Sequence, residues 1–238
     1  MFIVSAIKRQ LHRDIVADPV LHAQVLNLYL NGEEYPHRVV DYFPLAAVED
    51  AALERRMRLH MREEDKHIAL YRKAIRALGE PVKTLPREEI YNAVILRHTP
   101  AQPALRREDD RDARTLKLAH FLGHLHWLEK RIAQSLEYHL EACAQGATPY
   151  AAKAVAAVLA DEYGHVSYTR EAVAGLLPAR LARDVLALHR GGEARANREF
   201  SSTQLRRLVT EHAARFRPAR RFLYRGCCAL IPEGMNHG

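Results

Sequence analysis

The sequence is poor in cysteine, glycine and proline, with three, eleven and eleven of these among 238 residues. Cys143, Cys227 and Cys228 form no even framework and no Cys-x-x-Cys pair. Neither a disulfide scaffold nor a thiolate metal site is therefore indicated, and a reducing cytoplasm is the expected location. Alanine, leucine, arginine and glutamate dominate instead, which favours helices over sheets. We predict an all-α protein.

Long apolar runs are also absent. No stretch approaches the roughly 18 apolar residues that span a bilayer, and Lys8 and Arg9 follow the short apolar start instead of preceding it. We expect neither a signal peptide nor a membrane anchor. Charge is unevenly spread: residues 1–175 contain 24 Lys and Arg against 24 Asp and Glu, whereas residues 176–238 contain 12 against 5. The whole net charge of +7 therefore lies in the C-terminal quarter.

Helix start and stop signals predict four long helices. The first begins near Pro19, and the spacing of Gly32 and Pro36 predicts a kink around Glu33 more than a stop, with the end near Pro44. The others are expected at about 50–78, 109–146 and 149–176. A proline-rich crossover at 80–108, with one helical stretch at 87–97, joins the second helix to the third. Further short helices are expected at 2–17, 179–190 and 202–216.

This order of helices and links is the connectivity of a four-helix bundle with a single long crossover. We divide the chain into an N-terminal short helix at 1–18, a bundle at 19–176 and a basic helical extension at 177–238.

Two Glu-x-x-His motifs, Glu64 with His67 and Glu162 with His165, place both side chains on one helix face. With 19 Glu and 14 His in the chain, chance gives roughly one such pair, so the motif alone is weak. The helical phase strengthens it, because Glu64 and Glu162 fall where the apolar stripes of their helices require core residues.

The other two helices each add one carboxylate. Glu129 is the single carboxylate in its apolar stripe, and Glu33 shares a face with Leu26 and Leu30 while Glu34 does not, so we select Glu33. Four buried carboxylates are prohibitive unless cations or protons neutralise them. A metal pair does so, and these oxygen donors with one imidazole per ion favour iron or manganese over zinc. Buried Glu–His pairs without metal are the alternative.

The pattern resembles the ferritin-like di-iron carboxylate superfamily, in which a Glu and a Glu-x-x-His recur twice across four helices. The resemblance covers about 19–176 and implies that two metal ions are held by six ligands: Glu33, Glu64, His67, Glu129, Glu162 and His165. Asp161-Glu162-Tyr163-Gly164-His165 is similar to the form common in the oxygenase branch, where the Asp supports a histidine ligand. Glu63 stands at that place in the first motif. Ile132 stands where rubrerythrin-type peroxidases carry an additional Glu, which disfavours them.

Four residues lie close to the proposed ligands and are candidates for supporting roles: His60, His37, His126 and Tyr71. The alternative for each is a packing role in the core. In the extension, arginines alternate with Phe216, Phe222 and Tyr224, a mixture that could bind phosphate and stack on bases. The candidates for nucleic-acid contact are Arg206, Arg207, Arg217, Arg220, Arg221 and Arg225. A helix face that docks on the bundle is the alternative.

The resemblance implies an oxidoreductase in which two iron ions, O2 and an electron donor hydroxylate or desaturate an organic substrate. Superfamily members of similar length include tRNA hydroxylases that act on a modified adenosine, and the basic extension makes RNA a candidate partner. One alternative is iron handling, as in ferroxidases and ferritins. Another is a nucleic-acid-binding protein whose metal site is structural.

Overall fold

The computed structural model describes residues 2–35, 43–100, 105, 108–144 and 149–230. The protein is all-α, as predicted, and no strand occurs within these ranges. None of the helices in the same ranges has both the length and the apolarity needed to cross a membrane.

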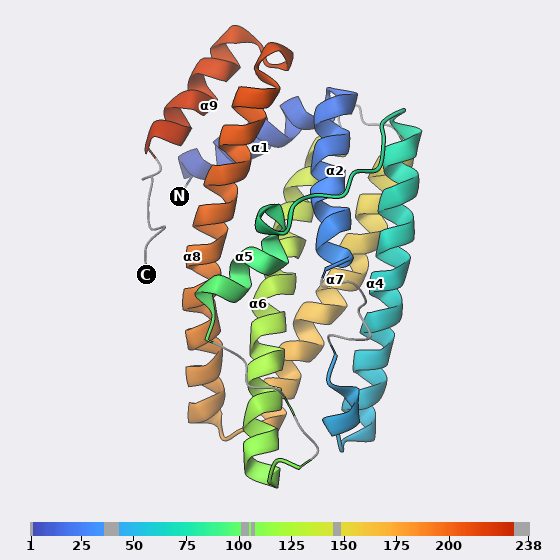
Figure 1. The fold of residues 1–238 in the computed structure, drawn as a ribbon, viewed down its shortest axis with the longest axis vertical. Coiled ribbons are helices and arrows are strands. Elements are labelled where there is room, and N and C mark those ends of the chain that lie inside the picture. Colours follow the sequence, from blue (N-terminus) through green and yellow to red (C-terminus); the bar gives the residue numbers. More distant parts are fainter. Residues whose placement is uncertain (1, 36–42, 101–104, 106–107, 145–148, 231–238) are drawn as a thin grey trace.

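Four helices surround a common interior (Figure 1). They are α2 (Pro19–Glu33), α4 (Ala51–Ala77), α6 (Arg111–Cys143) and α7 (Pro149–Leu176). α2 packs antiparallel to α4, α6 packs antiparallel to α7, and α4 packs against α7. The colours in Figure 1 show that α4 and α6 run in the same direction, which requires a long crossover between them.

Local capping explains where these helices begin and end. The side chains of Asp18, Asp50 and Asp110 accept hydrogen bonds from backbone amides in the first turns of α2, α4 and α6. Gly79, just beyond α4, has a φ of 77°, a left-handed conformation that glycine adopts without strain. The predicted ends of the second helix and the start of the third are thus confirmed. The fourth helix ends at Leu176, as expected, while Thr148 lies outside the described residues.

The first long helix ends at the place where a kink was predicted, and its predicted continuation to about Pro44 falls mainly on residues that the structure does not describe. α2 stops at Glu33, where the sequence favoured a kink, and Glu34 closes the last turn by donating its backbone amide to the Leu30 carbonyl. Residues 36–42, which include His37, lie outside the described part of the chain. Phe43 and the short helix η1 (Leu45–Ala47) then lead into α4.

The crossover contains the short helices η2 (Arg87–Glu89) and α5 (Tyr91–His98). Two buried asparagines of α2 hold its first part: Asn27 accepts a hydrogen bond from the Lys83 amide (2.7 Å) and Asn31 accepts one from the Leu85 amide (2.8 Å). Their side-chain amides also donate to crossover carbonyls. The chain is thereby held along α2 before α5 packs against α8.

α8 (Ala179–Glu211) is one helix of 33 residues, so the prediction of two separate helices at 179–190 and 202–216 is wrong. Its middle contains Gly191 and Gly192, and Gly192 lies so close to α5 that an added Cβ would stand 2.7 Å from the His98 carbonyl oxygen. Packing on α5 and α6 therefore maintains a helix through a segment of weak helix propensity.

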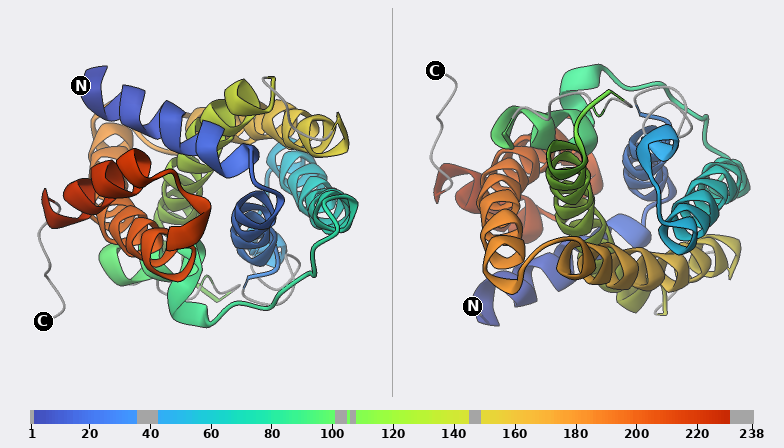
Figure 2. Two further views of the ribbon diagram at one scale, coloured as in Figure 1. Left: turned by 90° about the horizontal axis from the view of Figure 1, so that it is seen from above. Right: turned by 90° about the horizontal axis from the view of Figure 1, so that it is seen from below.

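The C-terminal elements η3 (Ala213–Arg215) and α9 (Pro218–Leu230) fold back beside α1 (Phe2–Val16), as Figure 2 shows from above. Tyr224 is fully buried, and its hydroxyl donates to Asp14 of α1 at 2.7 Å. Phe216 is buried in the same apolar cluster, which also takes in Leu21 and Val25 of α2. The end of the chain is therefore part of the packed structure, as far as Cys228.

Candidate metal centre

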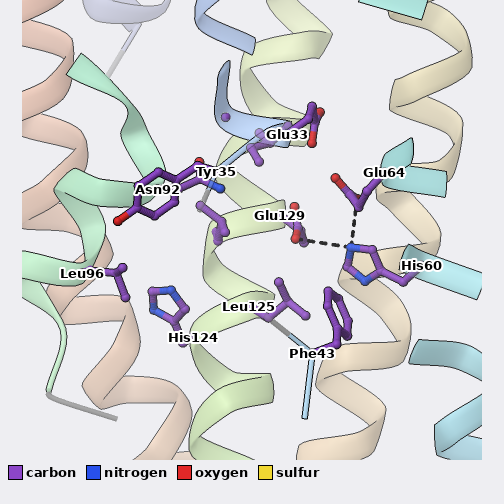
Figure 3. Close-up of a pocket in the computed structure, with 13 residues that line it drawn as sticks. Glu33, Tyr35, Phe43, His60, Glu64, Asn92, Leu96, His124, Leu125 and Glu129 are labelled. Carbon is purple, nitrogen blue, oxygen red and sulfur yellow. Dashed lines mark ion pairs between the residues drawn. The ribbon is translucent and has the colours of Figure 1, made fainter. Parts of the chain in front are cut away.

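Four buried carboxylates meet between α2, α4, α6 and α7. Glu33 comes from the end of α2, Glu64 from α4, Glu129 from α6 and Glu162 from α7, and their exposed fractions are 7, 7, 4 and 0%. Figure 3 shows Glu33, Glu64 and Glu129 pointing toward one another. The structure thus brings together all four carboxylates that the sequence selected.

The helical period places these groups inward. On α4 the buried side chains recur every three or four residues, so the two sequence-predicted members Glu64 and His67 face the same interior as the apolar residues around them. The buried residues of α4 are Leu53, Met57, His60, Glu64, His67, Tyr71, Ala74 and Ile75. The same rule turns Glu162 and His165 of α7 inward.

One set of donor atoms surrounds the Nδ1 atom of His67. This nitrogen lies 3.7 Å from Glu33 Oε1, 3.8 Å from Glu64 Oε1 and 3.6 Å from Glu162 Oε1. These separations are too long for hydrogen bonds. Two donor atoms that each lie about 2.1 Å from one ion are about 3 to 4 Å apart, so the set has the spacing of ligands around a metal.

A second set of donor atoms surrounds His165 and His60. His165 Nδ1 lies 3.3 Å from Glu162 Oε2 and 3.4 Å from Glu64 Oε1. His60 Nε2 lies 3.0 Å from Glu64 Oε1 and 3.5 Å from Glu129 Oε1. The two imidazole rings stack, with their centroids 3.5 Å apart. His60, which the sequence placed in a supporting role, therefore presents a nitrogen to the carboxylates directly.

Glu162 belongs to both sets. Its Oε1 atom faces His67 and its Oε2 atom faces His165, at 3.6 and 3.3 Å. A carboxylate whose two oxygens face two different histidines is arranged to bridge a pair of ions. Glu64 also reaches both sets, through a single oxygen.

Each of the three histidines has its outer nitrogen held by another side chain. His67 Nε2 lies 3.0 Å from Asp161 Oδ2 on α7, and His165 Nε2 lies 3.0 Å from Glu63 Oε2 on α4. His60 Nδ1 lies 2.8 Å from the Tyr168 hydroxyl. Such partners fix the ring and its tautomer, which leaves the inner nitrogen free to bind a metal.

Burial and mutual repulsion raise the pKa values of Glu33, Glu129 and Glu162 in the metal-free protein. Burial opposes ionisation of Glu64 as well, but its contacts with Glu33 and His60 lower its pKa. Burial favours the neutral ring of His60, yet Glu129 and Glu64 raise its pKa to about 9. Without cations, protons must therefore carry the positive charge that the cluster needs.

Two divalent ions fit the residues present. Two buried atoms of the cluster, His67 Nδ1 and Glu162 Oε1, have no hydrogen-bond partner and lie 3.6 Å apart. Each is a metal-binding atom that points into the cluster, and a buried polar atom left unpaired is costly. Four carboxylates also carry the charge that two divalent cations neutralise. Oxygen donors with imidazoles suit iron or manganese.

The other candidates lie as follows. Glu34 lies at the surface, where Arg72 donates to it at 2.5 Å. His126 is buried but its Nδ1 lies 3.1 Å from the Val166 carbonyl, which indicates a packing role. Tyr71 is fully buried beside the cluster, and its hydroxyl has no hydrogen-bond partner. A donor role for His60 could have been predicted from the sequence, because His60 precedes Glu64 by one turn on the same apolar stripe.

A cavity of about 40 Å³ adjoins the carboxylates and extends toward α5 (Figure 3). It touches Glu33, Glu64 and Glu129 on one side. Its apolar wall consists of Phe43, Leu96, Leu125, Leu128 and Ile132. Asn92 and His124 supply polar groups on the side away from the carboxylates. The cavity could not be predicted from the sequence, because α5 and Phe43 line it. Their positions depend on how the segments between the helices fold, which helical periodicity does not predict.

The basic extension contributes to the packing of the fold. Arg207 forms ion pairs with Glu89 and Glu211, and Arg220 lies 3.7 Å from Asp14. Phe216 and Tyr224 are buried, which leaves Phe222, 82% exposed, as the accessible ring of the three. Arg217 and Arg225 are exposed, while Arg206 and Arg221 are half-buried. Two of the three aromatics that could have stacked on bases are thus unavailable, and the alternative, docking of the extension on the rest of the fold, agrees with their burial.

Comparison with known protein families, curated proteins and solved structures finds no match for this chain. The donor atoms and their surroundings are therefore what indicate a function.

Proposed function

We propose that the protein is a ferritin-like di-iron carboxylate oxidoreductase that uses O2 to hydroxylate or otherwise oxidise an organic substrate. Iron is the expected metal, with an iron–manganese pair as the variant that the same donors accept. The order of the helices, the parallel α4 and α6 and the two Glu-x-x-His motifs agree with this type of bundle.

One observation carries the proposal. The Nδ1 atom of His67 is completely buried and has no hydrogen-bond partner, although three carboxylate oxygens lie 3.6 to 3.8 Å away. A protonated imidazole would draw these oxygens into hydrogen-bond distance. An ion between them accounts for the spacing and for the free nitrogen at once.

The chain would hold the two ions with Glu33, Glu64, His67, Glu129, Glu162 and His165, and His60 is a seventh donor. When bound, reduced iron supplies electrons to O2 and so generates the oxidant for the substrate. The protein side chains would hold the ions and orient the ligands. Asp161, Glu63 and Tyr168 fix the three imidazoles from outside the cluster.

The apolar wall of the cavity would limit contact with water on the side of the cluster where O2 and substrate would meet. A volume of about 40 Å³ holds a few water molecules. It suits O2 and the reacting end of a small organic molecule. A modified tRNA base, suggested by the basic extension, has less support, because the extension buries two of its aromatics and pairs several of its arginines.

Oxygen uptake by the iron-loaded, chemically reduced protein tests the proposal. We expect O2 consumption that is lost in metal-free protein and in Glu162→Ala. Where the reaction is a hydroxylation, the label from isotopic O2 should enter the organic product. An iron-loaded protein that does not react with O2 contradicts the proposal. Uptake that yields only stored ferric iron would assign the chain to iron handling instead.

A further inference from the structure

A second group of metal-binding side chains lies between the start of α2 and the end of α6. It consists of His22, His139 and Cys143, whose exposed fractions are 0, 0 and 4%. One donor atom from each residue lies within 4.8 Å of the others. None of the three is a member of the carboxylate cluster.

The helix geometry brings these donors close together. His139 and Cys143 are four residues apart on α6 and therefore share one face. His22 Nε2 lies 2.9 Å from His139 Nε2. Two imidazole nitrogens on a tetrahedral zinc ion are about 3.3 Å apart, so the rings need to separate by only a few tenths of an ångström to admit an ion.

The surroundings also suit a metal. The outer nitrogen of His139, Nδ1, lies 3.3 Å from the Tyr29 hydroxyl, an arrangement that fixes the ring. Val16, Ala142 and Ala152 pack against Cys143 and keep the thiol dry. His12 of α1 also lies near the cluster, with its ring centroid 5.8 Å from that of His139.

Two tyrosines separate this group from the carboxylates. The Tyr29 ring lies 5.5 Å from His139 and 5.7 Å from Tyr71, which borders the carboxylate cluster. An ion bound at His139 would therefore not contact the carboxylate ligands.

We propose that His22, His139 and Cys143 bind one thiophilic metal ion, with Zn²⁺ as the ion that this donor set fits best. Binding forms bonds from the ion to two neutral imidazole nitrogens and to the Cys143 sulfur, and it releases the thiol proton to solvent. The ion ties the first turn of α2 to the last turn of α6. The proposal does not depend on the activity of the carboxylate centre.

Cobalt substitution separates the two sites, because a thiolate-to-cobalt charge-transfer band requires sulfur and the carboxylate cluster has none. We expect the full-length protein, stripped of metal and titrated with Co²⁺, to develop this band with one equivalent bound at the site. Cys143→Ser should abolish it, whereas Cys227→Ser with Cys228→Ser should keep it. Glu162→Ala should keep it as well.

No band in the wild-type protein, or a band that survives Cys143→Ser, overturns the proposal. Zinc protection provides a second measurement that does not need a folded cysteine variant. Zn²⁺ should slow alkylation of Cys143 in the wild-type protein by at least tenfold, with peptide mapping to locate the label, and His139→Gln should remove this protection. Equal alkylation of Cys143 with and without Zn²⁺ contradicts the site.

Discussion

Asp161 on α7 holds His67 on α4, with 3.0 Å between Asp161 Oδ2 and His67 Nε2. The reverse pairing joins the same two helices, because Glu63 on α4 lies 3.0 Å from His165 on α7. In each motif the residue before the glutamate therefore supports the histidine of the other motif. This reciprocity ties the two halves of the proposed centre together and gives it an approximate twofold character.

Asp161→Asn should weaken metal binding, because the amide keeps the shape of the side chain but loses its charge and cannot orient the His67 ring as well. We expect a loss of about 10- to 100-fold in affinity for the more tightly held ion. Metal titration of the stripped protein measures it. Asp65→Asn, an exposed change on α4, is the matched control, and equal affinities in the two variants would contradict the role of Asp161.

His60→Ala removes a nitrogen that faces Glu64 and Glu129. We expect iron content to fall from close to two ions per chain toward one, because the second set of donors loses one of its two imidazoles. His126→Ala removes another buried histidine that hydrogen-bonds the Val166 carbonyl, and it should retain both ions. Full occupancy in His60→Ala would return His60 to a supporting role.

Acid should destabilise the protein through its buried neutral histidines. His124 is suited to a test, because burial is the cause of its lowered pKa. Burial lowers the pKa of His124 to about 4, against about 6.5 in an unfolded chain. The unfolded state therefore binds the extra proton between these values. The stability that the neutral ring contributes is present above about pH 6.5 and is lost as the pH falls toward 4.

His124→Leu should accordingly flatten the dependence of the free energy of unfolding on pH by close to one proton, or about 1.4 kcal/mol per pH unit. Urea titrations of metal-free protein between pH 6 and pH 4.5 measure this slope. An unchanged slope would show that His124 binds a proton as readily in the folded state as in the unfolded state, and would contradict the effect of burial on its pKa.

Tyr224→Ala should cost about 3 kcal/mol or more of stability, because the ring is fully buried and its hydroxyl bonds Asp14. Phe222 lies on the same helix and is 82% exposed, so Phe222→Ala should change stability by less than about 0.5 kcal/mol. Thermal or urea unfolding distinguishes the two. If Tyr224→Ala is neutral while Phe222→Ala lowers RNA affinity, the extension is a binding surface more than a packed element.

Helix caps and apolar stripes were sufficient to predict α4, α6, α7 and the four carboxylates. Asp50, Asp110 and Gly79 are local signals that act through the backbone, and Glu129 stands out because a charge interrupts an apolar period. The continuity of α8 through Gly192 was not predictable, since contacts with α5 override a weak local propensity there. The helical period predicts which side of a helix a residue occupies, but not how far its side chain reaches into the interior. It therefore placed His60 beside the cluster without showing that the His60 Nε2 atom faces the carboxylates.

The iron content of the purified protein tests the central claim most directly, when Glu33→Ala and Glu34→Ala are measured beside the wild type. Glu33 is buried within the cluster, whereas Glu34, one residue later, pairs with Arg72 at the surface. Elemental analysis should find close to two iron or manganese ions per chain in the wild type and in Glu34→Ala, and clearly fewer in Glu33→Ala. A stably folded wild-type protein that binds neither metal, or equal content in all three proteins, would contradict the dinuclear centre.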